Sequence, residues 1–131
     1  MNAAILTNEF PPEIYGGAGI HGKFLSQGLS KLCHIEAPCF GPQNDDADNI
    51  RAIGFSQKLE CTPADERFKK ILKPLDINLQ WMSSLKDIDV IHCHTWYSHF
   101  GGVVASRLLQ CPLILTTHSL EPHRPWKAEQ L

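Results

Sequence analysis

The stretch TNEFPPEIYGGAGIH, residues 7–21, decides the fold of this chain. It follows the apolar run at residues 3–6, which is typical of a short buried strand. It leads into residues 22–32, where apolar or small residues recur at helical spacing: Phe24, Leu25, Gly28, Leu29 and Leu32. We therefore predict that the stretch is a strand-to-helix loop.

This loop has the composition of an anion site. Pro11 and Pro12 hold its first half extended, because each fixes φ and removes an N–H. Gly16 and Gly17 leave the backbone free of side chains and free to adopt positive φ. Bare N–H groups ahead of a helix N-terminus favour a phosphate or another anion. For such a loop taken alone, a connector without a ligand remains an equal alternative.

Part of the same stretch, residues 17–22, fits the G-x-G-x-x-G spacing of dinucleotide-binding domains. In those domains the glycines follow the first strand at once, and an acidic residue lies about 20 positions further on. Here the glycines come well after the strand, and the second expected strand ends in Cys39 and Phe40. A nucleotide-binding oxidoreductase is therefore the less favoured alternative.

Length and composition are those of one ordinary globular domain. The chain has 131 residues, of which 43% are hydrophobic and 20% charged, and a formal net charge of −2. This charge offers no basic surface for nucleic acid or for an anionic membrane. No apolar run approaches the ~20 residues of a membrane span, and we recognise no signal peptide. We expect a cytoplasmic protein with neither a nucleic-acid nor a membrane partner.

The five cysteines are scattered along the chain without a C-x-x-C pair. Their number is odd, and Cys33, Cys39, Cys93 and Cys111 lie in or beside apolar runs. Reduced cysteines used as small core residues fit this pattern better than a disulfide framework does.

Beyond the first helix the chain alternates strands with helical segments. We expect strands at 34–40, 50–55, 89–94 and 112–117, and helices at 74–85 and 101–109. The first of these helices would pack through Leu75, Leu79, Met82 and Leu85. Residues 41–49 are expected to be an exposed turn, Pro63 is a possible helix start, and Pro74 is placed in a first helical turn. The pattern predicts an α/β fold, a Rossmann-like, mostly parallel doubly wound sheet with helices on both faces.

In such a sheet ligands bind beyond the carboxyl ends of the strands, where the strand order reverses. The loop at residues 7–21 and residues 94–96 follow the two strands at that point, and the last strand delivers His118 to the same edge. As a neutral donor His118 could hydrogen-bond a sugar hydroxyl or a phosphate, and as imidazolium it could offset negative charge. For an isolated histidine a purely structural role remains the commoner case.

His92 and His94 stand two positions apart on one expected strand, a spacing that could suggest a metal. No further Asp, Glu or Cys follows at a ligand spacing, so we expect no metal site. His92 is expected to be a partly buried strand histidine.

Trp96 and Tyr97 offer flat apolar faces beside polar edges, a surface on which sugar rings stack, although aromatic residues more often lie in the core. Glu9, Glu13 and Glu121 are the carboxylates nearest the mouth of the expected crevice. No spacing marks two of them as a pair for general acid–base catalysis.

Three motifs coincide along the chain. They are EFPP and GGAGIH within residues 9–21, DVIHCHTW at 89–96, and LTTHSLEP with RPWK within 115–127. Together they resemble the amino-terminal domain of bacterial glycogen synthases and related retaining glycosyltransferases, over nearly the whole chain.

The resemblance implies a GT-B enzyme, in which two Rossmann-like domains face each other across a cleft. It implies glucosyl transfer from ADP-glucose or UDP-glucose to an α-glucan or a sugar phosphate, with neither a metal nor a cofactor. Gly16 and Gly17 would lie at the donor phosphates, and His118 would act catalytically beside the transferred sugar. The implied acceptor and sugar surface comprises Glu9, His94, Thr95, Trp96 and Tyr97.

Two positions depart from the better-known branch, which carries a lysine at the place of Tyr15 and an aspartate at the place of Thr95. The departures fit a branch resembling actinobacterial and cyanobacterial-type enzymes, and they leave the acceptor open between a glucan chain and a sugar phosphate. Residues 1–131 would form a partial N-terminal domain without the nucleotide-sugar domain. We therefore expect the chain alone to be inactive and to self-associate through an incomplete sheet edge. A non-catalytic binding or assembly module that kept the fold is the alternative.

Overall fold

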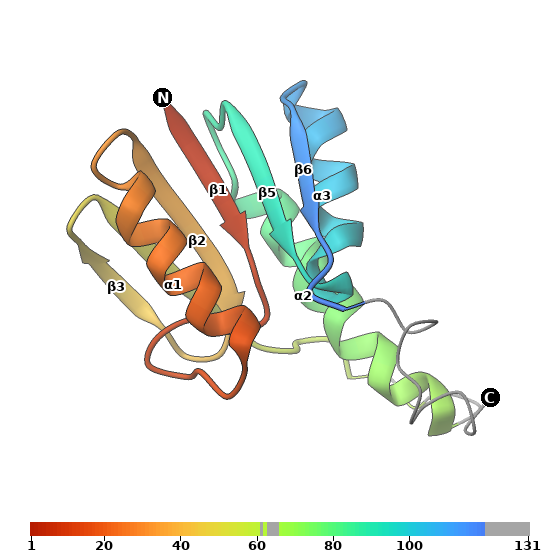
Figure 1. Cartoon of the computed structure of the whole chain (residues 1–131). Helices are drawn as coiled ribbons and strands as arrows, with labels where there is room; N and C mark the ends of the chain where they lie inside the picture. The colour runs from red at the N-terminus through yellow and green to blue at the C-terminus, as the bar shows by residue number, and fades with distance from the viewer. Residues whose placement is uncertain (61, 63–65, 120–131) are drawn as a thin grey trace.

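The computed structural model describes residues 1–60, 62 and 66–119 (Figure 1). It contains a six-stranded sheet in the order β3-β4-β2-β1-β5-β6. The strands are β1 Asn2–Leu6, β2 His34–Phe40, β3 Asn44–Ala47, β4 Ile50–Phe55, β5 Val90–His94 and β6 Leu113–Thr116. The helices are α1 Gly17–Leu29, α2 Lys69–Ser84 and α3 Trp96–Leu109, and the 3₁₀ turn η1 Glu66–Phe68 leads into α2. All neighbouring strands pair parallel except β3 with β4, which confirms the predicted mostly parallel α/β fold.

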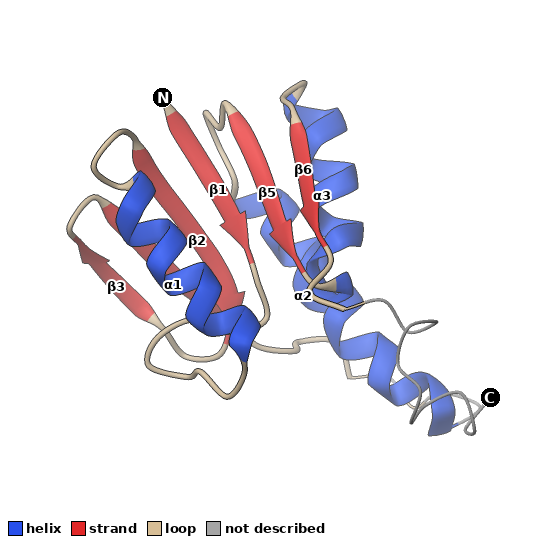
Figure 2. Cartoon of the chain, viewed as in Figure 1, coloured by secondary structure: helices blue, strands red, loops and turns tan. Residues whose placement is uncertain are grey.

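Helices cover both faces of the sheet: α1 lies on one face, and α2 and α3 lie on the other (Figure 2). Because successive side chains of a strand point to opposite faces, β1 contributes side chains to two separate hydrophobic cores. Ala3 and Ile5 belong to the core under α1, whereas Ala4 and Leu6 pack with α2 and α3. Burial on both faces explains why β1 reads as an unbroken apolar run.

The strand order reverses between β1 and β5, which pair directly, with Ala4 opposite Ile91 and Leu6 opposite Cys93. From β1 the chain runs through α1 to β2 on one side, and it later returns to add β5 and β6 on the other. The carboxyl ends of β1 and β5 therefore meet at one edge, as the sequence predicts for a ligand site.

The first helix differs from the expectation in its bounds and in its buried face. It begins at Gly17 instead of residue 22 and ends at Leu29, so Leu32 lies beyond it, exposed. Phe24 is exposed as well, and the buried residues of α1 are Gly19, Gly22 and Ser26. Of these, Gly19 is needed because α1 approaches the preceding loop closely there: a Cβ on Gly19 would lie 2.8 Å from the Cβ of Glu9.

The second helix also begins earlier than expected, at Lys69, so Pro74 lies inside it and not in its first turn. The buried stripe is also different, because Leu79 is exposed while Ile77, Trp81 and Leu85 are buried, each four residues from the next. Pro63 lies outside the residues that the structure describes.

Residues 41–49 are not simply an exposed turn. Residues 44–47 form β3, an exposed strand that pairs antiparallel with β4. Asp48 and Asn49, both at positive φ, make the two-residue connection between these strands, as Asp and Asn do in tight hairpins. Gln43 is buried and donates a 2.9 Å hydrogen bond to the carbonyl of Phe10, which anchors this hairpin to the loop after β1.

The cysteines within the described ranges are free thiols: Cys33, Cys39 and Cys93 are buried, and Cys111 is partly buried. Within the same residues, no helix is long and apolar enough to cross a membrane.

Candidate active site at the carboxyl ends of the strands

A hollow of about 550 Å³ lies beyond the carboxyl ends of β1 and β5. Its walls come from the loop after β1, the first turns of α1 and α3, and the chain after β6: Glu9, Gly16, Gly17, Ala18, His21, Thr95, Trp96, Tyr97, His118 and Ser119. The structure thus brings together most of the residues that the sequence singles out. Their roles as binding or catalytic groups remain predictions.

Glu9 shapes the loop from inside. Its side chain is buried, and Oε2 accepts hydrogen bonds from the backbone N–H of Gly16 at 2.8 Å and of Tyr15 at 3.2 Å. Gly16 is extended, with φ −147° and ψ 174°, and the glycine with positive φ in the described chain is Gly41, so Gly16 and Gly17 do not use the positive φ that glycine permits. The carboxylate of Glu9 therefore lies inside the loop and holds its backbone through these two hydrogen bonds.

Because Glu9 already accepts from the N–H of Gly16, the backbone N–H groups that a ligand could use begin at Gly17. The N–H of Gly16 already has an acceptor in Glu9, whereas Gly17 and Ala18 form the first turn of α1, where backbone N–H groups have no partner within the helix. Both residues line the hollow. An anion bound here would meet the amino-terminal dipole of α1 through these two groups.

A second helix N-terminus lies at the same hollow. α3 begins at Trp96, directly after Thr95, and not at residue 101 as expected. Thr95 has φ 67° and ψ 160°, a region that β-branched residues rarely adopt, and its Oγ1 donates a 3.0 Å hydrogen bond to Oδ1 of Asn8. Asn8 in turn donates to the hydroxyl of Tyr15 at 3.4 Å. These contacts join the first turn of α3 to the loop after β1.

Trp96 and Tyr97 provide the flat surface of the hollow. Their ring centroids are 4.1 Å apart and the rings are stacked. Trp96 is 55% exposed, which excludes a core role for it, while Tyr97 is half-buried. An exposed indole at a polar hollow is suited to stacking on a sugar ring.

A buried asparagine that the sequence analysis did not single out holds this part of α3 in place. The carboxamide of Asn78, on α2, donates 2.7 Å hydrogen bonds to the carbonyls of Pro74 and Tyr97, and it accepts one of 2.6 Å from the N–H of Gly101. A Cβ on Gly101 would lie 2.6 Å from Oδ1 of Asn78, so the glycine permits this contact. The signal for Asn78 in the sequence is weak, because its place next to the buried Ile77 on α2 is all that indicates its burial.

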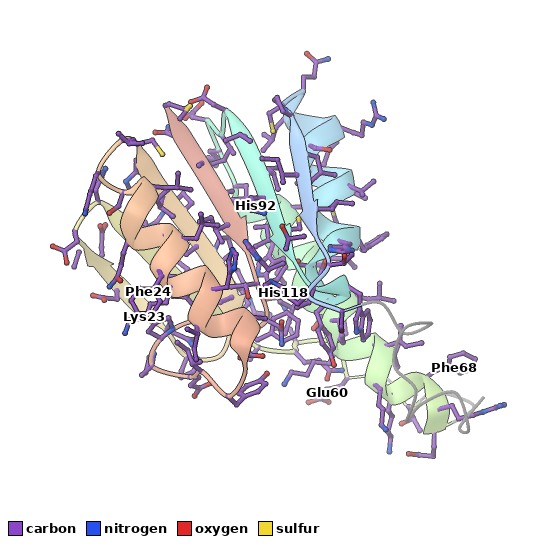
Figure 3. The ribbon with its side chains drawn as sticks, in the orientation of Figure 1. Lys23, Phe24, Glu60, Phe68, His92 and His118 are labelled. Carbon is purple, nitrogen blue, oxygen red and sulfur yellow. The ribbon has the colours of Figure 1, made fainter. Side chains whose placement is uncertain are left out.

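Four histidines gather beside the hollow, and Figure 3 shows His92 on β5 and His118 just beyond β6. Nδ1 of His94 lies 3.0 Å from Nε2 of His118. The ring centroid of His21 is 5.2 Å from that of His94 and 5.3 Å from that of His118. His92 is half-buried, as expected, and its Nε2 hydrogen-bonds Oγ1 of Thr116 at 2.7 Å.

Burial lowers the pKa of three of these histidines, His92, His94 and His118. It lowers the pKa of His94 to about 3, helped by the neighbouring histidines, chiefly His92. The pKa of His92 is lowered by burial and then by His21 and His118. The pKa of His118 is lowered by burial and by His21, against the opposing carboxylate of Glu9. At neutral pH, His94 and His118 are therefore neutral imidazoles.

Two expected residues lie outside the wall of the hollow, and a third falls outside the described residues. His94 is fully buried and is not part of the wall of the hollow, so it reaches the hollow through His118. Glu13 lies beside Gly41 and not in the wall, while Glu121 falls outside the described residues. The described residues contain no group of three or more His, Cys, Asp or Glu side chains that could hold a metal ion.

A larger hollow of about 650 Å³ lies at the opposite end of the sheet, between the end of α3 and the start of β6. Its walls include Val103, Arg107, Gln110 and Leu113. Because it lies at the amino end of β6, away from the strand reversal, it is a less suitable site than the smaller hollow.

Residues 15–131 match the family model described as Glycosyltransferase Family 4. The chain is 40% identical over all of its 131 residues to an alpha-maltose-1-phosphate synthase from Mycolicibacterium smegmatis and 38% identical to one from Mycobacterium tuberculosis. It is 30% identical over 92% of its length to an uncharacterized glycosyltransferase from Methanocaldococcus jannaschii. In each case it covers 32% of the relative, so it spans about a third of the length of these proteins.

Proposed function

The chain belongs to glycosyltransferase family 4, and from this premise we propose that it is the amino-terminal part of a retaining glucosyltransferase. The donor is ADP-glucose or UDP-glucose, and the acceptor is a sugar phosphate. The observation that carries the proposal is the hollow at the strand reversal, where two helix N-termini, an exposed tryptophan and a neutral histidine meet.

The hollow has the groups that a sugar phosphate needs. The N-termini of α1 and α3 offer backbone N–H groups and the positive ends of two helix dipoles, which favour a phosphate. Trp96 offers an exposed ring face for the sugar, and His118 offers a neutral polar ring for a sugar hydroxyl. Glu9 keeps the glycine loop open without occupying the N–H groups of Gly17 and Ala18.

The names of the relatives favour a sugar phosphate over a glucan chain as the acceptor. Two of them are named alpha-maltose-1-phosphate synthase, at 40% and 38% identity over the whole chain. A glycosyltransferase makes a maltose 1-phosphate by joining a glucosyl unit to glucose 1-phosphate. We propose the same acceptor class for this protein, in place of the α-glucan of a glycogen synthase.

In this mechanism His118 donates a hydrogen bond to a hydroxyl of the transferred glucosyl unit and holds that unit in the geometry of the transition state. Gly17 and Ala18 offer their N–H groups to phosphate oxygens. A second domain, expected from the resemblance, would bind most of the nucleotide and stabilise the leaving diphosphate. The chain's one-third share of the relatives' length leaves room for such a domain.

The phosphate contact can be tested with one pair of variants. Gly17 is the first residue of α1, it follows the extended Gly16, and a Cβ on Gly17 would touch nothing within 4 Å. Proline is well tolerated at such a position, so Gly17→Pro removes the N–H while keeping the helix. Gly17→Ala is the matched control, because it keeps the N–H.

Binding of glucose 1-phosphate, ADP-glucose, UDP-glucose and NAD is measured by titration calorimetry and by amide chemical shifts. We expect glucose 1-phosphate to shift the amides of Gly17 and Ala18, Gly17→Pro to weaken its binding about tenfold, and Gly17→Ala to bind as the parent does. Saturable binding of NAD in place of every sugar phosphate would overturn the proposal. If the longest product of the gene binds a sugar phosphate but transfers no glucosyl unit, the result would point to a non-catalytic binding module.

A further inference from the structure

We infer that His94 is a positioning residue for His118, whose imidazole it holds in the tautomer that carries the proton on Nδ1. The catalytic consequence of this inference rests on the proposed function. Its structural part, the state of the two rings, does not.

The backbone fixes the place of His94 from two sides. On β5, His94 pairs in register with Thr116 of β6, and His118 follows two residues later. On the other side Oγ of Ser98, in the first turn of α3, donates a 2.9 Å hydrogen bond to the carbonyl of His94. The 3.0 Å contact between Nδ1 of His94 and Nε2 of His118 is therefore set by strand pairing and by a helix.

The second ring nitrogen of His94 has no such contact. Nε2 of His94 is buried, and it has no hydrogen-bond partner among the described residues. The ring is fully buried, with the ring centroid of His92 at 4.2 Å and that of His21 at 5.2 Å. Because His94 is neutral in this environment, it carries one N–H, which is either on Nδ1 or on Nε2.

The two choices differ in which group is left without a partner. With the proton on Nε2, a buried N–H donor would face no acceptor, an arrangement that folded proteins rarely contain. With the proton on Nδ1, the N–H donates to Nε2 of His118, and only a lone pair of His94 is left over. The geometry therefore favours His94 as the donor and His118 as the acceptor.

This direction determines what His118 can offer to a ligand. Since its Nε2 accepts from His94, the proton of the neutral ring of His118 lies on Nδ1. His118 lines the hollow, so it enters any reaction there as a donor of fixed tautomer. A group prepared in this way needs no rearrangement when charge develops on its partner.

The state of the rings is tested by nuclear magnetic resonance on the protein with ¹⁵N-labelled histidines at neutral pH. We expect a scalar coupling across the hydrogen bond between Nδ1 of His94 and Nε2 of His118, with the proton on His94, and a protonated Nδ1 on His118. His118→Gln removes the coupling and so assigns it. His34→Asn is the control. His34 lies on β2, where it bonds Asn49 and Glu36, so its replacement should leave the coupling unchanged. A protonated Nε2 on His118 would overturn the inference, as would the absence of the coupling.

The role in positioning is tested by kinetics in an enzyme of full family length. His94→Leu should lower kcat ten- to a hundredfold with little change in KM, because binding groups remain while the donor loses its orientation. His94→Asn keeps an amide near the place of Nδ1 and should recover part of the loss. Wild-type kcat in a folded His94→Leu variant would remove His94 from this role.

The two proposals fail separately. If His94→Leu does not fold, the Asn variant and the coupling in the wild-type protein decide the matter. If the coupling is present but the enzyme transfers no sugar, the proposed function is wrong and the assignment of the two rings stands.

Discussion

Oγ1 of Thr95 donates a 3.0 Å hydrogen bond to Oδ1 of Asn8, across 87 positions of sequence. The bond joins the residue that precedes α3 to the loop that follows β1, and both border the candidate site. Thr95 makes it from a backbone conformation with φ 67° and ψ 160°, which is unfavourable for a β-branched residue. The site therefore contains local strain that the surrounding contacts hold in place.

This strain can be measured by comparing Thr95→Gly with Thr95→Ala. Both variants lose the hydroxyl and its bond to Asn8, but only glycine adopts the observed φ and ψ without steric cost. After the entropic cost of glycine is taken into account, we expect the Gly variant to be more stable than the Ala variant by about 1 kcal/mol. Urea unfolding of the two variants gives the difference, and an Ala variant of equal or greater stability would show that Thr95 is unstrained.

His118→Ala in an enzyme of full family length should lower kcat about a hundredfold, equivalent to about 3 kcal/mol, with a smaller effect on KM. His118 is exposed, but its loss leaves the buried N–H of His94 without an acceptor, so the same substitution should also lower the free energy of unfolding by about 1 to 3 kcal/mol. Steady-state kinetics and thermal melting of one preparation separate the two effects. A variant that melts several degrees early yet turns over normally would remove His118 from the site.

Acid should destabilise the protein through His94. Its ordinary pKa of 6.5 falls to about 3 in the folded chain, so below pH 6.5 the unfolded chain binds a proton that the folded chain does not. The stabilising effect of the neutral ring is complete above pH 6.5 and is lost as the pH falls towards 3, by at most about 1.4 kcal/mol per pH unit. Urea unfolding between pH 7 and 4 should show a shallower pH dependence for His94→Asn than for the parent. Parallel curves would contradict the lowered pKa.

The chain of 131 residues should self-associate through β6. This strand pairs with β5, and within the described part of the chain no strand pairs with its other edge, where Ile114 and Leu115 are about half exposed. Sedimentation velocity at high micromolar concentration should detect dimers or larger species, and Leu115→Lys should shift the distribution towards monomer. A single monomer peak for the parent chain would refute this prediction.

The same chain should transfer no glucose from ADP-glucose or UDP-glucose to glucose 1-phosphate. In residues 1–131 alone, the charge that develops on the leaving diphosphate would face water on the side that a second domain is proposed to cover, and it would lose most of its stabilisation. Release of the nucleoside diphosphate is the measurement, and a longer product of the gene is the positive control. Turnover by the purified 131-residue chain would show that one domain suffices.

The strands could be predicted from the sequence, and the starts of the helices could not. The expected strand at 34–40 matches β2 residue for residue, because strands buried on both faces leave continuous apolar runs. In contrast, α1, α2 and α3 each begin five residues before the expected positions. None of the three has a side-chain hydrogen bond at its N-cap: Gly16 and Phe68 cannot cap in this way, and Thr95 donates its hydroxyl to Asn8 instead.

The convergence of residues at the site follows from topology, whereas their contacts do not. The carboxyl ends of β1 and β5 had to meet once the sheet was parallel, and this brought the glycine loop towards His118. No pattern in the sequence indicates that Glu9 bonds the N–H of Gly16, or that Asn78 bridges α2 and α3. These contacts join residues whose spacing in the sequence carries no periodic signal.

The pairing of β1 with β5 also bears on how the protein is made. β1 contains residues 2–6 and β5 contains residues 90–94, so a ribosome must deliver most of the chain before these strands can meet. Contacts of such long sequence separation form late and slow the folding of a domain. The hollow cannot form in a nascent chain that still lacks β5, because its two sides are held together by this pairing. Ligand binding at the hollow would therefore report that β1 and β5 have paired.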